Sequence, residues 1–371
     1  MPSSLEGAAY AAPWWLPGGH AQTIYASLFA PRPRLTYRRE RWETPDGDFI
    51  DLDWLAEEQG VSSIGCRVAA GERSGSRNEG AAPITRHSSL VTARPLVVLF
   101  HGLEGSSRSH YAAALMAAVR DAGWRGVVVN FRGCSGEPNR LPRAYHSGDA
   151  REIDWILRRL RERNAAGALY AAGVSLGGNA LLKWLGESGA EACTGVERAA
   201  AVSAPLDLMI SGDALGKGFN LFYARHFLVS LKPKALAKHA LHPGLLDPAR
   251  IRAAQTLRAF DDVVTAPLHG YRDTDDYWTR ASSKPGLKDI AVPTLVINAR
   301  NDPFLPREAL PAPHEVSPAV TLEQPEEGGH CAFVVGAFPG SLMWLPQRLL
   351  RFFKNHPHEP PISSTHGANR L

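Results

Sequence analysis

The chain has 371 residues, of which 44% are hydrophobic and 21% are charged, as is ordinary for a protein that buries a core. This composition excludes a chain that is disordered throughout. The formal net charge of +4 comes from scattered basic residues without a long run of like charges, so we expect no nucleic-acid partner.

The cysteine spacing and the hydropathy of the chain give expectations about metal sites, disulfides and membrane segments. The cysteines form no CxxC pair and no spacing interleaved with histidines, so neither a metal site nor a dense disulfide framework is expected. No stretch approaches about 18 consecutive apolar residues, and the first residues lack the basic and apolar regions of a signal peptide. We therefore expect a cytoplasmic protein without a transmembrane segment. The sequence leaves peripheral membrane contact and the oligomeric state open.

The N-terminal part of the chain is irregular. Residues 1–40 are predicted to form an arm that carries Trp14, Trp15 and the string "GGHAQT". The string "FIDLDWL" follows, and its alternation of apolar and polar residues predicts a half-buried strand. Residues 57–93 are rich in Gly, Ser, Arg and Ala with little periodicity, which indicates a polar insertion at the surface.

From Pro95 onward, short apolar runs alternate with helical patterns. The runs that predict strands are "PLVVLF", "RGVVVNF", "ALYAAGV" and "RAAAVSAP", and the patterns between them that predict helices are "SHYAAALMAAVRDAG", "GDAREIDWILRRLRER" and "NALLKWLGESG". Because these strands are apolar throughout, they predict a mostly parallel central sheet with helices on both faces. The expected fold class is therefore α/β.

The alternation stops over residues 206–280, where only helical or irregular patterns appear, and this predicts an inserted helical cap. Strand patterns resume at "VPTLVINAR" and end with "AVTLEQ". We expect one main domain over residues 41–355. Residues 356–371 are Pro-rich and polar, which predicts a flexible tail.

The string "GVSLG" places Ser175 between two glycines, at the point where a strand pattern gives way to a helical pattern. In such a G-x-S-x-G turn the glycines let the strand and the helix pack closely, and the serine Oγ projects above the carboxyl end of the sheet. We therefore predict that Ser175 is a nucleophile. The alternative is a serine that only shapes the turn or caps the helix.

A nucleophilic serine needs a base, and the base needs an orienting acid, which in this strand–turn–helix arrangement follow in the order serine, acid, histidine. His330 follows the last predicted strand in "EEGGHCAF", and Asp302 directly follows "PTLVINAR". The alternatives are a structural loop histidine and an Asx turn before proline. Asp261, Asp262 and Glu327 are weaker candidates for the acid because none directly follows a core strand.

The oxyanion of a tetrahedral intermediate needs hydrogen-bond donors. The backbone N–H of Leu176, the residue after the nucleophile, is one candidate, and the backbone N–H of Leu103 in the loop "HGLEGS" is the other. His101 in this loop is open to interpretation as a second base, but a histidine before a glycine at a strand end more often shapes the loop.

Two further motifs contain reactive side chains but are weaker candidates for a catalytic or metal-binding role. "FRGCSGEPNR" holds Cys134 and Ser135 beside glycines but lacks the second glycine of G-x-S-x-G, so we expect a structural loop near the active site. His20 in "GGHAQT" has no second ligand nearby in the sequence. We expect it to dock the arm or to line a pocket.

Together these strings resemble the YheT-like branch of the α/β-hydrolase superfamily. The resemblance spans roughly residues 12–353 and is carried by "GGHAQT", "HGLEGSSRSHY", "GVVVNFRGCSGEPNRLPRAYHSGD", "GVSLGGNALLKWLGE", "DTDDYWTRASS", "ARNDPFLP" and "GGHCAF". It implies the α/β-hydrolase fold and places Ser175, Asp302 and His330 on the family's catalytic positions. One departure is Asn301, where relatives often have a first aspartate, and a second departure is the polar insertion.

The expected function is that of a serine hydrolase of carboxylic esters, acting without a metal or an organic cofactor through an acyl-enzyme. The expected substrates are small-molecule or lipid esters, from short- and medium-chain acyl esters to monoacylglycerol-type lipids. The expected substrate-binding residues are His101, Gly102, Phe219 and Phe222. A thioesterase or amidase on the same residues and a non-catalytic binding module are the alternatives.

Overall fold

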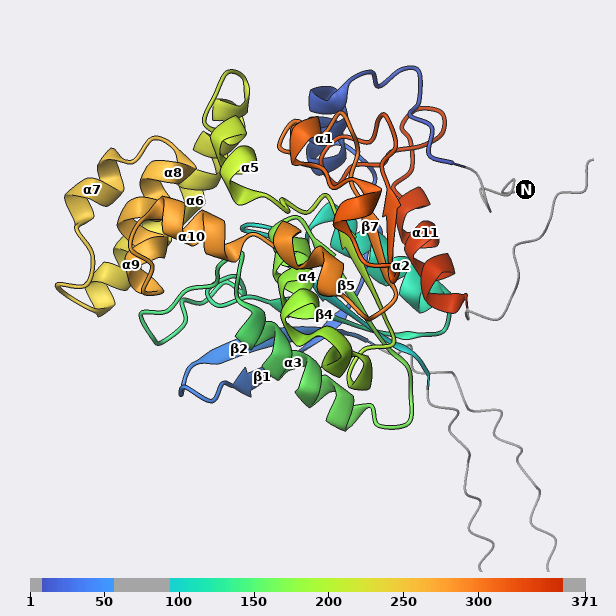
Figure 1. Ribbon diagram of the computed structural model, residues 1–371, viewed down its shortest axis with the longest axis horizontal. Helices are drawn as coiled ribbons and strands as arrows, with labels where there is room; N and C mark the ends of the chain where they lie inside the picture. The colour runs from blue at the N-terminus through green and yellow to red at the C-terminus, as the bar shows by residue number, and fades with distance from the viewer. Residues whose placement is uncertain (1–8, 57–93, 356–371) are drawn as a thin grey trace, which may run out of the picture.

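The computed structural model describes residues 9–56 and 94–355, so the predicted insertion at 57–93 and the predicted tail at 356–371 lie outside the described residues. One eight-stranded sheet, in the order β1-β2-β4-β3-β5-β6-β7-β8, runs through the molecule (Figure 1). β2 pairs antiparallel with β1 and β4, and all other neighbours are parallel, which confirms the predicted α/β class. The strands are β1 (Tyr37–Glu43), β2 (Phe49–Leu55), β3 (Leu96–Phe100), β4 (Arg125–Asn130), β5 (Leu169–Val174), β6 (Arg198–Val202), β7 (Thr294–Ile297) and β8 (Val320–Glu323).

The central parallel strands are buried on both faces. In β3, Leu96, Val98 and Phe100 pack into the core on one side of the sheet. Val97 and Leu99 pack into the core on the other side. Burial on both faces explains why these strands are apolar throughout rather than alternating.

Helices cover both faces of the sheet. One core contains side chains of α3 (Ala150–Arg163) and α4 (Leu176–Ser188), and the opposite core contains side chains of α2 (His110–Asp121) and α11 (Trp344–Lys354). The apolar residues of α3 recur at helical spacing and are buried, because they form the stripe that faces the sheet. Short helical turns complete the connections: η1 (Gly189–Thr194), η3 (Lys284–Asp289), η4 (Arg307–Ala309) and η5 (Pro313–Glu315).

The strand β2 differs from the prediction. We expected "FIDLDWL" to be half buried, but six of its seven residues are buried. Its aspartates meet protein groups instead of water: Arg41 Nε donates to Asp51 at 2.8 Å, and Arg39 Nε donates to Asp53 at 2.7 Å. Ser107 Oγ also donates to Asp53, at 2.6 Å. The half-buried prediction is wrong because ion pairs and hydrogen bonds cover the polar face of this strand.

Between β6 and β7 the chain forms helices only, and these inserted helices gather at one side of the molecule, beyond the sheet (Figure 1). They enclose a small apolar core of their own that includes Leu228, Ile251 and Phe260. The boundaries of the predicted domains stay a prediction. The inserted helices are α5 (Leu208–Leu215), α6 (Asn220–Leu241), α7 (Pro248–Ala253), α8 (Leu257–Phe260), the π-helical turn η2 (Asp261–Thr265), α9 (Ala266–Leu268) and α10 (Thr274–Ala281).

The string "GGHAQT" opens a helix, α1 (Gly19–Leu28), that the sequence analysis does not predict. His20 Nδ1 lies 3.0 Å from Tyr223 Oη of α6, and the two rings stack. The arm therefore contacts the inserted helices through His20, as expected of a docking residue. The described part of the chain also contains no helix with the length and the apolar character needed to cross a membrane.

Candidate active site

Ser175 occupies the sharp turn between β5, which ends at Val174, and α4, which begins at Leu176. Its backbone has φ 53° and ψ −121°, a strained conformation for a residue with a Cβ. Ser175 N–H donates to Val202 O at 2.8 Å, and Asn179 N–H donates to Ser175 O at 3.0 Å. The neighbouring strand and the following helix thus hold the turn in place.

The glycines of the motif are required by close packing. A Cβ on Gly173 would lie 2.5 Å from Gly177 O, and a Cβ on Gly177 would lie 2.5 Å from His101 O. Neither distance leaves room for a side chain, so each position fits only glycine. The pattern G-x-S-x-G therefore records how closely β5, α4 and the loop after β3 approach one another.

Three side chains from distant parts of the sequence meet at the carboxyl end of the sheet. His330 Nε2 lies 3.0 Å from Ser175 Oγ, and His330 Nδ1 lies 2.8 Å from Asp302 Oδ2. Phe304 N–H donates to the other oxygen of Asp302 at 2.8 Å, and the Phe304 ring stacks on His330. These contacts fit the tautomer in which Nδ1 donates to Asp302 and Nε2 accepts the proton of Ser175.

The carboxylate of Asp302, which is 4% exposed, controls the proton affinity of His330. Burial lowers the pKa of His330, but the negative charge of Asp302 and its hydrogen bond outweigh burial, so the pKa lies above the ordinary value of 6.5. A raised pKa makes the neutral imidazole a stronger base toward the hydroxyl that it contacts.

Two backbone N–H groups lie beside Ser175. One belongs to Leu176, the first residue of α4. The other belongs to Leu103, in a loop so close that a Cβ on Gly102 would lie 3.0 Å from Ser175 Cβ. The N–H groups of Gly102 and Glu104 each donate to a tyrosine hydroxyl, at 2.9 and 2.8 Å. Within residues 9–56 and 94–355, the N–H of Leu103 between them has no acceptor, which leaves it open to a ligand.

The structure does not bring the predicted substrate-binding residues to the wall of the adjacent cavity. His101 is fully buried, its Nε2 accepts from Phe131 N–H at 3.1 Å, and burial lowers its pKa to about 4. It shapes the loop that contains Gly102, which is the alternative that the sequence favoured. Phe219 and Phe222 are each 58% exposed on the inserted helices, so their placement does not support contact with a substrate.

The helix α1 holds the loop of His330 in place through hydrogen bonds. The sequence did not predict this role for α1. Thr23 Oγ1 accepts from His330 N–H at 2.8 Å. Gln22 Oε1 accepts from Asn301 Nδ2 at 3.1 Å and from Gly328 N–H at 3.0 Å. Both residues belong to the string "GGHAQT", which is the signal for this role. The loops of the candidate acid and the candidate base are therefore both tied to the N-terminal helix.

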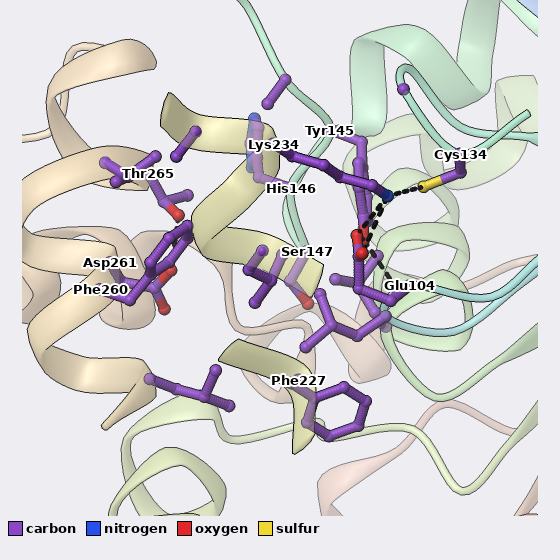
Figure 2. Close-up of a pocket in the computed structure, with 18 of the residues that line it drawn as sticks. Glu104, Cys134, Tyr145, His146, Ser147, Phe227, Lys234, Phe260, Asp261 and Thr265 are labelled. Atoms are coloured by element: carbon purple, nitrogen blue, oxygen red, sulfur yellow. Dashed lines mark hydrogen bonds and ion pairs between the residues drawn. The ribbon is translucent and has the colours of Figure 1, made fainter. Parts of the chain in front are cut away.

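A cavity of about 570 Å³ opens beside Ser175 and continues beneath the inserted helices. Figure 2 shows polar groups at its two sides, with Glu104, Cys134 and Lys234 on one and Asp261 on the other. Lys234 Nζ and Glu104 Oε2 form an ion pair at 2.8 Å. Most other lining side chains are apolar, as is usual for small-molecule sites. Over the described ranges, no cluster of His, Cys, Asp and Glu side chains suited to a metal ion is present.

The mostly parallel sheet with helices on both faces, and the serine turn at its carboxyl end, define the class of the protein. A family model described as the alpha/beta hydrolase fold matches residues 95–337. The chain belongs to the α/β-hydrolase family. Within it, the chain belongs to the YheT-like branch, because it is 39% identical over 332 residues to "Putative esterase YheT" of Escherichia coli (strain K12), covering 89% of this chain and 88% of that relative.

Two eukaryotic proteins and one solved structure are also similar to the chain. The chain is 28% identical to "Phospholipase ABHD3" of Homo sapiens, covering 93% of this chain and 79% of that protein. It is also 28% identical to "Medium-chain fatty acid ethyl ester synthase/esterase 2" of Saccharomyces cerevisiae, covering 90% of this chain and 83% of that protein. The solved structure of the Pyrococcus furiosus esterase Pf2001 matches with a TM-score of 0.50 at 14% identity, covering 86% of this chain and 92% of that chain, which supports the fold alone.

Proposed function

We propose that this protein is a serine hydrolase that cleaves carboxylic esters through an acyl-enzyme intermediate, with Ser175 as nucleophile, His330 as base and Asp302 as orienting acid. The observation that carries the proposal is the continuous pair of hydrogen bonds from Asp302 through His330 to Ser175, at 2.8 and 3.0 Å. The names of the esterase and phospholipase relatives support ester chemistry.

In the first half of the reaction, Ser175 Oγ bonds to the ester carbonyl carbon while His330 Nε2 takes the hydroxyl proton. Asp302 accepts the hydrogen bond from Nδ1–H and stabilises the imidazolium that forms. When the tetrahedral intermediate collapses, the bond between the carbonyl carbon and the alcohol oxygen breaks. The alcohol leaves with the proton from Nε2, and the acyl group stays on Ser175.

In the second half, water attacks the acyl carbon and gives its proton to His330 Nε2. Collapse of the second intermediate releases the acid and returns the proton to Ser175 Oγ. In both halves the carbonyl oxygen becomes an oxyanion, and we propose that the N–H groups of Leu176 and Leu103 stabilise it. Such donors are already oriented before the negative charge develops on the carbonyl oxygen. They therefore lower the reaction barrier without a rearrangement of the protein during the reaction.

The cavity supports a preference for esters with an apolar part. Its volume of about 570 Å³ suits a ligand of moderate size, and its wall is mainly apolar. We propose short- to medium-chain acyl esters or monoacylglycerol-type lipids as substrates, with the inserted helices acting as a cap. The yeast relative is named for medium-chain fatty acid ethyl esters, which supports this size range.

The direct test is hydrolysis of p-nitrophenyl esters of increasing acyl length by purified protein. The variant Ser175→Ala should lose about 10⁶-fold in kcat, because residues that act as a unit fail together. Ser135→Ala is the matched control: this serine in the glycine-rich loop after β4 does not line the cavity, so the variant should keep most activity. Near wild-type activity in Ser175→Ala would overturn the proposal.

Matched substrates distinguish an esterase from a thioesterase or an amidase. Rates on an ester, a thioester and an amide with the same acyl group should be highest for the ester. A faster thioester or amide reaction that still depends on Ser175 would replace the esterase by a thioesterase or an amidase. Absence of hydrolysis of every substrate would favour the non-catalytic binding module.

A further inference from the structure

One hydroxyl in the cavity wall has no hydrogen-bond partner in the described part of the chain. Ser211 lies on α5, is 2% exposed and lines the cavity. Its backbone N–H makes an ordinary helical bond to Asp207 O at 3.1 Å. Its Oγ, however, has no hydrogen-bond partner among the residues that the structure describes. Buried hydroxyls are nearly always paired, so an occupant of the cavity is the natural partner of this one.

A second polar group in the same wall has spare capacity. Asp261 begins η2 and accepts hydrogen bonds from Thr265 Oγ1 at 2.5 Å and from Trp278 Nε1 at 2.8 Å. A carboxylate offers about four acceptor positions, so two of them are used. In the described part of the chain, no basic side chain forms an ion pair with Asp261 that would compensate its burial, and burial raises its pKa to about 6.

Asp261 and Gly212, the residue that follows Ser211, both contact the side chain of Trp278. A Cβ on Gly212 would overlap the six-membered ring of Trp278, while the indole N–H donates to Asp261. Figure 2 shows Asp261 across the cavity from Glu104. The cavity therefore has a polar end among the inserted helices, separated by mainly apolar wall from the loop that adjoins Ser175.

We infer that this cavity takes an ester whose part remote from the scissile bond carries a hydroxyl group, with Ser211 and Asp261 as its hydrogen-bonding partners. A hydroxyl accepts from Ser211 and donates to a carboxylate, whereas a hydrocarbon end would leave Ser211 unpaired. A site with a buried polar group discriminates against the ligand that lacks the matching group. The inference rests on the proposed ester hydrolysis and adds the chemistry of the far end of the substrate.

The test compares matched esters over a series of chain lengths, ending in methyl, hydroxyl or amine, with the end group placed first on the acyl part and then on the alcohol part. For one placement, kcat/KM of the hydroxyl ester should exceed that of its methyl partner by roughly tenfold, and only near one chain length. Ser211→Ala should remove this preference, because kcat/KM of the hydroxyl ester falls while the methyl ester no longer leaves a buried hydroxyl unpaired and is hydrolysed at least as well as by the wild type.

Control variants separate the subsite from general damage. Ser230→Ala on α6 removes a hydroxyl that already donates to Phe227 O and should leave the preference intact. Asp261→Asn should weaken the preference, whereas Asp262→Asn, which alters a neighbouring carboxylate paired with Arg250, should not.

The inference is overturned if methyl esters are preferred at every chain length in both placements, or if Ser211→Ala keeps the full preference. A greater gain for the amine than for the hydroxyl would overturn the hydroxyl assignment. The p-nitrophenyl ester of acetic acid distinguishes failure of the subsite from failure of the proposed function, because it carries no chain with a terminal methyl, hydroxyl or amine group for the subsite to select. If Ser175-dependent hydrolysis of the acetyl ester persists without a hydroxyl preference, only the subsite is wrong.

Discussion

Among the described residues, His330 is the single hydrogen-bonding neighbour of Ser175 Oγ that can take its proton, and Asp302 raises the pKa of this histidine. His330 Nε2 contacts Ser175 Oγ, while Nδ1 contacts Asp302. Because Asp302 raises the pKa of His330, the same contact that strengthens the base also keeps it protonated to higher pH. The activity should therefore depend on pH through the ionisation of His330.

We expect kcat/KM of the wild type to rise with pH along a single ionisation whose pKa lies above 6.5, the ordinary value for histidine. Asp302→Asn removes the charge that raises the pKa and disturbs the tautomer, so kcat should fall by about 10³ to 10⁴-fold and the residual activity should titrate at lower pH. The pH profiles of both proteins check this. An unchanged profile in the variant would contradict the role of Asp302.

The residues that sequence reasoning placed correctly near one another share one property. Ser175, Asp302 and His330 each follow a strand, and carboxyl ends of parallel strands meet at one edge of a sheet, so their proximity could be predicted. The apolar character of Phe219 and Phe222 could not show that these rings point to the surface. Helical sequences reveal hydrophobicity, but neighbouring elements decide which face meets a cavity.

At the scale of elements, the connection of β5 to α4 depends on two glycines as much as on the serine. A Cβ on Gly177 would also clash with Phe100 O, in the strand β3. The motif thus encodes the packing of three elements, and this is why G-x-S-x-G between a strand and a helix predicts structure as well as chemistry.

We predict that Gly177→Ala lowers the free energy of unfolding by roughly 2 to 3 kcal/mol, because the new methyl group overlaps backbone atoms that cannot move apart cheaply. Gly195→Ala is the matched control, since a Cβ there would lie 3.7 Å from Ala192 O, an ordinary contact. Thermal or denaturant unfolding of both variants measures the difference. Equal stability of the two variants would contradict this explanation of the motif.

The strand β2 shows what the pattern of a single element cannot reveal. Its alternating aspartates indicate a solvated face, yet the arginines that cover Asp51 and Asp53 come from β1, an edge strand whose charged sequence gives no clear strand signal. The burial of such a strand depends on a partner that sequence periodicity does not identify.

At the scale of the whole molecule, the N-terminal helix reaches a site built from the other end of the chain. The bond from His330 N–H to Thr23 Oγ1 joins residues 307 positions apart. A Cβ on Gly19 would overlap Asn301 O, so α1 also packs tightly on the loop of the candidate acid. No local pattern could predict these contacts, although "GGHAQT" marks the residues that make them.

We expect Thr23→Val to lower kcat by about tenfold with little change in KM, because the partly buried N–H of His330 loses its acceptor and the imidazole loses its position. Thr23→Ser keeps the hydroxyl and should restore kcat. Steady-state kinetics of the two variants separates positioning from general loss of stability. A rise in KM alone, or failure of Thr23→Ser to restore kcat, would argue against a positioning role.

The central claim is that Ser175 is a nucleophile activated by His330. The most direct measurement is the site and rate of labelling by a fluorophosphonate probe, followed by mass spectrometry of the peptides. We predict rapid labelling of Ser175 in the wild type, labelling slowed by several orders of magnitude in His330→Ala, and none at that position in Ser175→Ala. Labelling of a different serine, or equal rates with and without His330, would contradict it.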